Sequence, residues 1–270
     1  MILNHRLITK CFLILMVMLT STSIAQAQQL IASGANMTET RSVSTFTSLE
    51  VSSAIDVIYT VGSQTKVTVT APQSIMKYVH TDVKGYKLKC FLMTNDYSGI
   101  NLDGRKVVIN ITAPTISEYD LSGASYVKVT NAVDKLPKLE IDLSGSSKME
   151  FGSVQCTKME IDMSGASNLD IKSLSCTSQD IDVSGASKIY IDKIKASKLE
   201  LDASGASHGE ISGEVGFCEI EISGASSYDL SGLIFKNGDV EVTGASSLTI
   251  NKKSGIDRLE STGSSTVKKK

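Results

Sequence analysis

Apolar and polar residues alternate through most of the chain. Segments such as "LEIDLSG", "MEIDMSG" and "LELDASG" carry an apolar side chain at every second position before a glycine. A period of two is typical of β-strands with one buried face, and no copy shows the 3.6-residue spacing of an amphipathic helix. The pattern predicts inward ladders of apolar side chains at equivalent positions: Ile141, Ile161, Ile181, Leu201, Ile220 and Val240.

The alternation resumes after each glycine. Met149 and Phe151 follow one glycine, and a third short apolar pair, Val154 and Cys156, comes next. Three short strands in about 20 residues are the content of one rung of a parallel β-helix. The sequence therefore predicts an all-β solenoid in which each rung buries the apolar face of its neighbour.

A short motif, [ST]-G-[AS]-S, returns eight times with steps of 22, 20, 20, 20, 19, 20 and 19 residues. A fixed period near twenty indicates a solenoid. The glycines are Gly123, Gly145, Gly165, Gly185, Gly205, Gly224, Gly244 and Gly263.

Each copy of this motif is predicted to be a corner of the rung. Glycine lets the chain bend without a Cβ clash. The following serines can hydrogen-bond along their own ladder or to the corner backbone. They are Ser125, Ser147, Ser167, Ser187, Ser207, Ser226, Ser246 and Ser265.

The chain before the repeats is less regular. Residues 28–45 are interpreted as an N-terminal extension and 46–270 as one β-helix domain, with regular repeats from about 116 to 270. Segments such as "TKVTVTAP" and "RKVVINITAP" alternate as strands do. We expect this half to begin the same solenoid with longer turns and to cap it, while the terminal "VKKK" places charge on the last rung.

Residues 1–27 have the pattern of an export signal peptide. A short basic region precedes the apolar stretch "CFLILMVML", and "AQA" (25–27) is a small-x-small cleavage site. Cleavage after Ala27 would leave a chain without a membrane span, located in the periplasm, at the cell surface or outside the cell. An uncleaved membrane anchor is the alternative.

Two further stretches suggest a family. "FTSLEVSSAIDVIYTVGSQTKVTVTAP" and "VVINITAPTISEYDLSGAS", followed by repeated "SGAS" corners, resemble the "putative auto-transporter adhesin head GIN domain" family over almost all of the mature chain. Members are exported proteins common in Bacteroidota. The resemblance implies a right-handed single-stranded parallel β-helix and brings no catalytic residues.

The outward positions before each corner carry acids in pairs. Clustered carboxylates suit Ca²⁺, whereas the alternative is a solvated face that resists aggregation, helped by the neighbouring Lys138, Lys158 and Lys198. The Gly-Gly-x-Gly-x-Asp calcium motif is absent, so the solvated face is favoured. The pairs are Glu118 and Asp120, Glu140 and Asp142, Glu160 and Asp162, Asp180 and Asp182, Glu200 and Asp202, Glu219 and Glu221, Asp239 and Glu241.

Cys156 and Cys176 fall at the same inward position of adjacent rungs. A spacing of about 4.8 Å permits a disulfide, and two buried free thiols are the alternative. Cys90 and Cys218 have no assigned partner.

Other chemistry is sparse. A net charge of −2 argues against nucleic acid as a partner. Catalysis would need an unrepeated constellation, and the best interruption of the repeat is "SHGE" with His208. No Ser/His/Asp grouping, HExxH or phosphate loop is present, and the sequence assigns no catalytic, cofactor-binding or metal residue.

These observations favour an exported, non-enzymatic, adhesin-like envelope protein that binds through a repetitive face. Its ligand is unknown, with a polysaccharide or a cell-surface protein as candidates. A structural envelope protein without a specific ligand is the first alternative, and a carbohydrate-active enzyme on a β-helix is the second.

Overall fold

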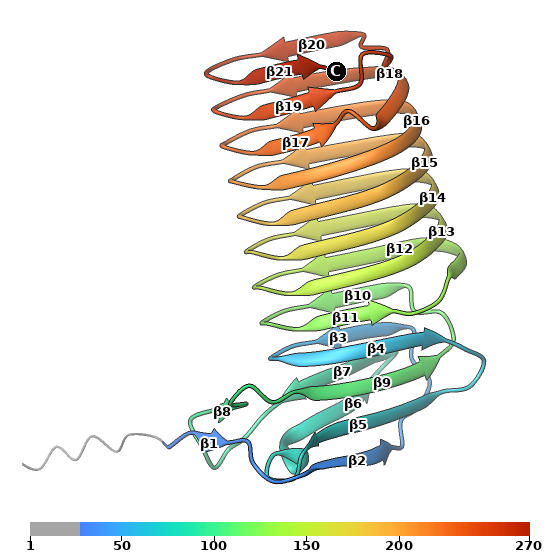
Figure 1. The fold of residues 1–270 in the computed structure, drawn as a ribbon. Helices are drawn as coiled ribbons and strands as arrows, with labels where there is room; N and C mark the ends of the chain where they lie inside the picture. Colours follow the sequence, from blue (N-terminus) through green and yellow to red (C-terminus); the bar gives the residue numbers. More distant parts are fainter. Residues whose placement is uncertain (1–27) are drawn as a thin grey trace, which may run out of the picture.

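The computed structural model describes residues 28–270 as strands stacked into a tall column (Figure 1). The expected signal peptide, 1–27, lies outside the described residues. The only helical turn in the described part is the 3₁₀ segment η1 (Met76–Tyr78). The strands of the regular column are β10 (Glu118–Leu121), β11 (Tyr126–Val129), β12 (Val133–Leu143), β13 (Lys148–Met163), β14 (Asn168–Val183), β15 (Lys188–Ala203), β16 (His208–Ile222), β17 (Ser227–Leu230), β18 (Leu233–Val242), β19 (Ser247–Ile250), β20 (Arg258–Ser261) and β21 (Thr266–Lys269).

Every strand of the column pairs in parallel with the equivalent strand of the next rung. Ile161 of β13 is opposite Ile181 of β14, and Ile181 is opposite Leu201 of β15. The partners are about 20 residues apart, so like residues form ladders along the axis. The predicted fold class, an all-β parallel solenoid with about 20 residues per rung, is confirmed.

Each long strand bends twice. In β14 the buried and outward positions alternate until Lys172 and Ser173 both point away from the core, and the alternation slips again at Thr177 and Ser178. These two breaks divide the rung into three short inward-facing segments. The three strands per rung that the apolar pattern predicts are therefore present, joined without a loop.

The repeated motif is a corner, as predicted. Its eight glycines have φ between 69° and 75°, the left-handed region that other residues avoid. A Cβ on Gly205 would lie 2.6 Å from the carbonyl oxygen and 2.9 Å from the nitrogen of Gly185 in the rung below. The corner serines are buried in all but the last copy, and Ser167 donates to Ser187 at 3.1 Å.

The N-terminal part is mixed in direction and closes the lower end of the column (Figure 1). β2 pairs with β5, β5 with β9 and β6 with β7, all antiparallel. Only β6 and β7 are consecutive strands joined as a hairpin, and β2 and β6 each have a single partner in the described sheet. The strands are β1 (Leu30–Ile31), β2 (Asn36–Arg41), β3 (Ser48–Val51), β4 (Ile55–Val61), β5 (Lys66–Pro72), β6 (Val79–Lys84), β7 (Lys87–Leu92), β8 (Ile100–Asn101) and β9 (Val107–Ala113).

The first rungs do not follow chain order. β3 and β4 pair in parallel with β10 and β11 on one side, and with β7 and β9 on the other. The rung formed by β3 and β4 comes first in the chain but lies second in the stack. The later strands β7 and β9 lie below it, and β10 and β11 lie above it. Alternation along the sequence gives no sign of this order.

Candidate binding face

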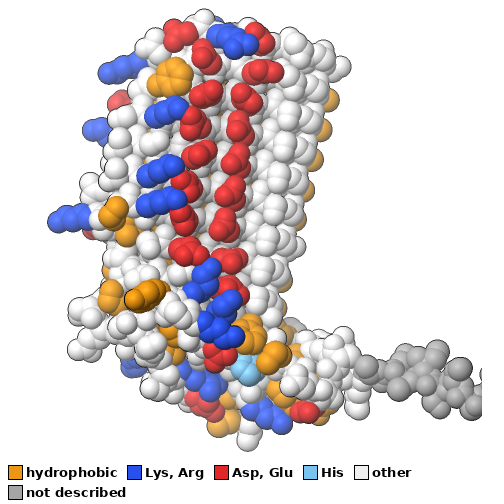
Figure 2. Space-filling model, turned by 180° about the vertical axis from the view of Figure 1, so that it is seen from behind, with side chains coloured by type: hydrophobic (Ala, Val, Ile, Leu, Met, Phe, Trp, Pro, Cys, Tyr) orange, Lys and Arg blue, Asp and Glu red, His pale blue; other side chains and the backbone are white. Residues whose placement is uncertain are grey.

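Two ladders of acidic side chains run along one face of the column (Figure 2). We call them the outer ladder and the corner ladder, and both together the acidic face. Within each ladder successive acids are directly opposite one another, as Asp142 is to Asp162 and Asp162 to Asp182. The outer ladder consists of Glu118, Glu140, Glu160, Asp180, Glu200, Glu219 and Asp239, and the corner ladder of Asp120, Asp142, Asp162, Asp182, Asp202, Glu221 and Glu241.

Lysines compensate the outer ladder. Lys138 makes ion pairs with Glu140 and, at 2.6 Å, with Glu160. Lys158 also contacts Glu160, at 2.5 Å, and Lys198 contacts Glu200. The lysines expected beside the acids are thus placed on the side away from the corners.

The corner ladder lacks such partners over most of its length. Among residues 28–270, the ion pairs of the acidic face involve only Asp120 of this ladder, which lies 3.9 Å from Lys87. The six acids above Asp120 have no lysine or arginine within ion-pair distance in the described structure. The outer ladder is therefore partly neutralised, whereas most of the corner ladder is left as a row of like charges.

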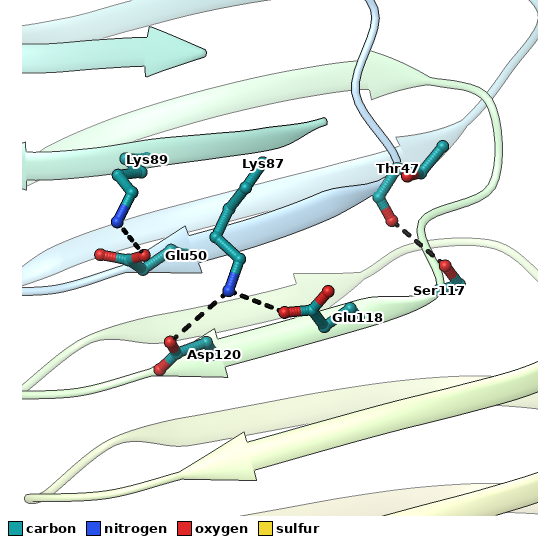
Figure 3. A network of polar contacts seen from close by, with 7 residues as sticks. All are labelled: Thr47, Glu50, Lys87, Lys89, Ser117, Glu118 and Asp120. Carbon is teal, nitrogen blue, oxygen red and sulfur yellow. Dashed lines mark hydrogen bonds and ion pairs between the residues drawn. The ribbon is translucent and has the colours of Figure 1, made fainter. Parts of the chain in front are cut away.

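The lower end of the acidic face is closed by residues from outside the repeat (Figure 3). Lys87 of β7 reaches Glu118 at 2.7 Å, and Lys89 reaches Glu50 at 2.5 Å. Nearby, Ser117 donates to the carbonyl oxygen of Thr47. At the other end Arg258 takes the register position above Asp239 and contacts Glu260 at 2.7 Å.

One acid of the outer ladder and several of the corner ladder have pKa values shifted in opposite directions by their surroundings. Hydrogen bonds from Lys138 and Lys158 lower the pKa of Glu160. Partial burial, and then the neighbouring carboxylates, raise the pKa of Asp142, Asp182 and Asp202. These three aspartates therefore hold their negative charge at a cost, because partial desolvation and like charges both disfavour the ionised form.

A shallow groove separates the corner ladder from the hydroxyl side chains that precede each corner glycine. Two of its hollows have volumes of about 210 and 220 Å³. Ser184 donates its proton to the carbonyl oxygen of Met163 at 3.0 Å, and Ser223 donates to that of Ala203 at 3.3 Å. With these protons used internally, the groove offers mainly acceptors. Its polar lining is Asp142, Ser144, Asp162, Ser164, Asp182, Ser184, Asp202, Ser204, Glu221, Ser223, Glu241 and Thr243.

The acids do not converge on a point. Within the described chain, no group of three or more His, Cys, Asp or Glu side chains is placed to hold a metal ion. Straight ladders spread carboxylates along a line, whereas Ca²⁺ takes six to eight oxygens around one centre. Each rung therefore brings only a few carboxylate oxygens near any one point of the ladder.

The interruption at "SHGE" has a packing explanation. Gly209 occupies an inward ladder position, opposite Tyr228 of the next rung. A Cβ on Gly209 would lie 2.5 Å from Cδ1 of Tyr228, so the buried tyrosine ring fills the space that glycine leaves. His208 lies beside this pair, with Nε2 3.6 Å from Glu210. The break in the repeat is thus needed for a large side chain in the core.

A separate hollow lies in the N-terminal part, beside the corner between β3 and β4. It has a volume of about 430 Å³ and a largely apolar wall. Met93 is 47% exposed there, although it is a large apolar residue. Sequence reasoning missed this apolar cleft, because its residues come from loops and strand ends that belong to no repeat. They include Ala54, Leu92, Met93, Tyr97, Ile100 and Leu102.

The fold and the acidic face define a class, namely a repeat solenoid that presents the same outward chemistry rung after rung. The family model described as "Putative auto-transporter adhesin, head GIN domain" matches residues 45–208 and 169–270. The chain belongs to that family, and the resemblance drawn from the sequence is confirmed.

Solved structures share the fold. A "putative lipid binding protein" from Parabacteroides distasonis has a TM-score of 0.78 at 17% identity, over 90% of this chain and 100% of the other. A "putative adhesin" from Parabacteroides merdae has a TM-score of 0.77 at 14% identity and the same coverage. A further "putative adhesin", from Bacteroides fragilis, has a TM-score of 0.62 at 19% identity, over 89% and 100%. No curated protein matches the chain.

The described residues contain no helix that is long and apolar enough to span a membrane.

Proposed function

We propose that the chain is an exported, non-enzymatic, adhesin-like protein that binds a partner at the cell envelope through its acidic face. The observation that carries this proposal is the groove along the corner ladder. It repeats one set of groups, a carboxylate and a hydroxyl oxygen, on successive rungs. Many weak and equivalent contacts suit attachment to a polymer, because each added contact strengthens the whole by avidity.

The chemistry of the groove restricts the partner. Carboxylates only accept hydrogen bonds, and serines whose protons are already donated accept as well. A partner must therefore supply donors, such as the hydroxyl groups of a neutral polysaccharide or the ammonium groups of an amine-bearing one. Polyanions are repelled by the row of uncompensated acids.

The same repetition argues against catalysis. A transition state is stabilised by a few unlike groups held in one place. The acidic face instead presents nearly the same groups on every rung, and His208 adds only a contact with Glu210. A structural envelope role without a ligand stays the first alternative, and a carbohydrate-active enzyme the second.

The binding test compares two variants of equal net charge. Replacing Asp142, Asp162, Asp182 and Asp202 with Asn removes four of the seven charges of the corner ladder. The matched control carries the same change at exposed acids elsewhere, namely Asp82, Asp103, Asp134 and Asp257. Purified proteins are titrated against immobilised neutral, amine-bearing and anionic glycans, at two salt concentrations.

We expect the ladder variant to lose avidity for the neutral or amine-bearing polymers by about tenfold or more, while the control binds like wild type. Equal binding by both variants would remove the acidic face from the proposal. Turnover of any glycan that His208→Ala abolishes would establish the enzyme alternative. If the purified protein binds none of the glycans and a strain that lacks the protein attaches to surfaces normally, only the structural role would remain.

Export has its own test. N-terminal sequencing of the protein from its native cell should begin at Gln28, as cleavage after Ala27 requires. An intact Met1 in the cytoplasm would refute export and, with it, an envelope role.

A second candidate function rests on the apolar cleft. Its lining suits a single apolar group, and one structure of the same fold is named a "putative lipid binding protein". Displacement of a fluorescent apolar dye by a fatty acid would measure such binding. Met93→Glu should abolish it, whereas Met37→Glu, at a 41% exposed position on β2 outside the cleft, should not.

A further inference from the structure

Two cysteines lie side by side on adjacent rungs. Cys156 of β13 and Cys176 of β14 are register partners at an inward position. They are 8% and 5% exposed, so both are nearly buried. The ladder continues to Leu136 below and to Ala196 above, and the latter is only partly buried. The small Ala196 leaves one side of the pair close to the surface.

The two sulfur atoms are within bonding reach of each other. The thiol of Cys156 donates to Sγ of Cys176 at 2.7 Å. Rungs about 4.8 Å apart give a Cα separation within the range that disulfides span. No backbone movement is needed to bring the pair together.

The pair is also polarised. Hydrogen bonding from Cys156 lowers the pKa of Cys176, while burial opposes the shift. The same contact raises the pKa of Cys156. Cys176 is therefore the thiol that reacts as a thiolate, with Cys156 beside it as a proton donor.

The other two described cysteines differ in each of these respects. Cys90 lies opposite Val51 and Thr81, and Cys218 opposite Leu199 and Gly238, so neither has a register partner that could form a disulfide. Burial raises the pKa of both to about 12. They serve as internal controls for reactivity.

We propose that Cys156 and Cys176 form a redox site, a dithiol that a small external disulfide converts into a covalent link between two rungs. The thiolate of Cys176 attacks the external disulfide, forms a mixed disulfide and releases one thiolate. Cys156 then gives up its proton and attacks Sγ of Cys176, which releases the second thiolate and closes the Cys156–Cys176 bond. Two protein thiols are oxidised and one external disulfide is reduced to two thiols.

The link joins residues 20 positions apart and so closes a loop of one rung. A disulfide stabilises by restricting the unfolded chain, and here it also prevents β13 from separating from β14. The redox state of the surroundings would then set how easily the middle of the column opens. This inference does not depend on the ligand of the acidic face.

The test treats the reduced, folded full chain with oxidised glutathione, alkylates the remaining thiols, and digests with trypsin without reduction. Cleavage after lysine places the two cysteines in separate peptides, 149–158 and 173–188, so a disulfide joins two peptides that are otherwise independent. We expect that linked pair from wild type and from Cys218→Ala. Alkylated, unlinked peptides from folded wild type would overturn the proposal.

Two further variants identify the attacking thiol. Cys156→Ser, which keeps a hydroxyl donor beside Cys176 but cannot close the disulfide, should trap glutathione on Cys176, at a rate about tenfold or more above that of Cys90 or Cys218. Cys176→Ala should leave Cys156 unmodified over the same time. In wild type, equal labelling of the four described cysteines, or formation of the link only after unfolding, would contradict a site built into the fold.

Discussion

Replacing Gly205 with Ala tests the explanation of the repeated corner. The change adds one methyl group at a residue with φ of +73°, directly above the backbone of Gly185. The left-handed conformation costs an L-residue about 1–2 kcal/mol. The new Cβ would also lie 2.6 Å from the oxygen of Gly185, so the two rungs must separate locally.

The separation weakens the hydrogen bond from the nitrogen of Ala206 to that oxygen, now 2.7 Å long. At these exposed corner residues the hydrogen bond contributes a net ~0.5–1.5 kcal/mol. Adding the conformational cost gives a total loss of about 1.5–3.5 kcal/mol in the free energy of unfolding, against a stability of about 5–15 kcal/mol for an ordinary domain.

Two other glycines separate these contributions. Gly85 has φ of +63° but an added Cβ would meet nothing within 4 Å, so Gly85→Ala should cost about 1 kcal/mol after the gain from a stiffer unfolded chain. Gly152 has neither constraint, and Gly152→Ala should be neutral or stabilise by about 0.5–1 kcal/mol.

Urea unfolding followed by circular dichroism gives the three free energies. Hydrogen exchange at Ala206 and its rung neighbours shows whether the loss is local, since repeat proteins can open in parts. The reasoning fails if Gly205→Ala is no more destabilising than Gly85→Ala, because the contact between rungs would then contribute nothing.

Four more predictions concern charge, metal binding and burial. Replacing Asp142, Asp182 and Asp202 with Asn should raise the melting temperature at pH 7. This gain should vanish as the pH falls through the raised pKa values of these acids, because on acidification the folded wild type binds protons before the unfolded chain does. Glu160→Gln, at an acid whose pKa is lowered, should do the reverse: it should destabilise at pH 7, with a loss that disappears on acidification. Adding Ca²⁺ should leave the melting temperature unchanged relative to equal ionic strength of NaCl, and a specific rise with Ca²⁺ would show a metal site on the corner ladder. Ile181→Asp should lower the free energy of unfolding by more than about 3 kcal/mol, because it places an unpaired charge between two apolar rungs. The control Ile181→Val should lower it by only about 0.5–1.5 kcal/mol. Similar urea midpoints for the two variants would place Ile181 outside the core.

The repeat made the column predictable. A ladder position such as Ile181 is constrained by the same packing as Ile161 and Leu201, so the alternation reports one structural rule several times over. The corner follows in the same way, since each glycine meets the glycine of the rung below. The N-terminal part repeats nothing, and the insertion of β3 and β4 between later strands depends on pairings that no local pattern encodes.

The acidic face shows the same division in its chemistry. A sequence that repeats necessarily stacks like charges, and the repeat itself can add only a regular partner such as the lysines beside the outer ladder. It cannot end a ladder. The cations that do so, Lys87 below and Arg258 above, come from a non-repeated strand and from the one copy that departs from the acid pair. The acceptor character of the groove was equally hidden, because it depends on where the proton of Ser184 goes and not on the presence of serine. In a solenoid the alternation predicts the frame, whereas the groups that distinguish one face from another are fixed by contacts between rungs and at the two ends.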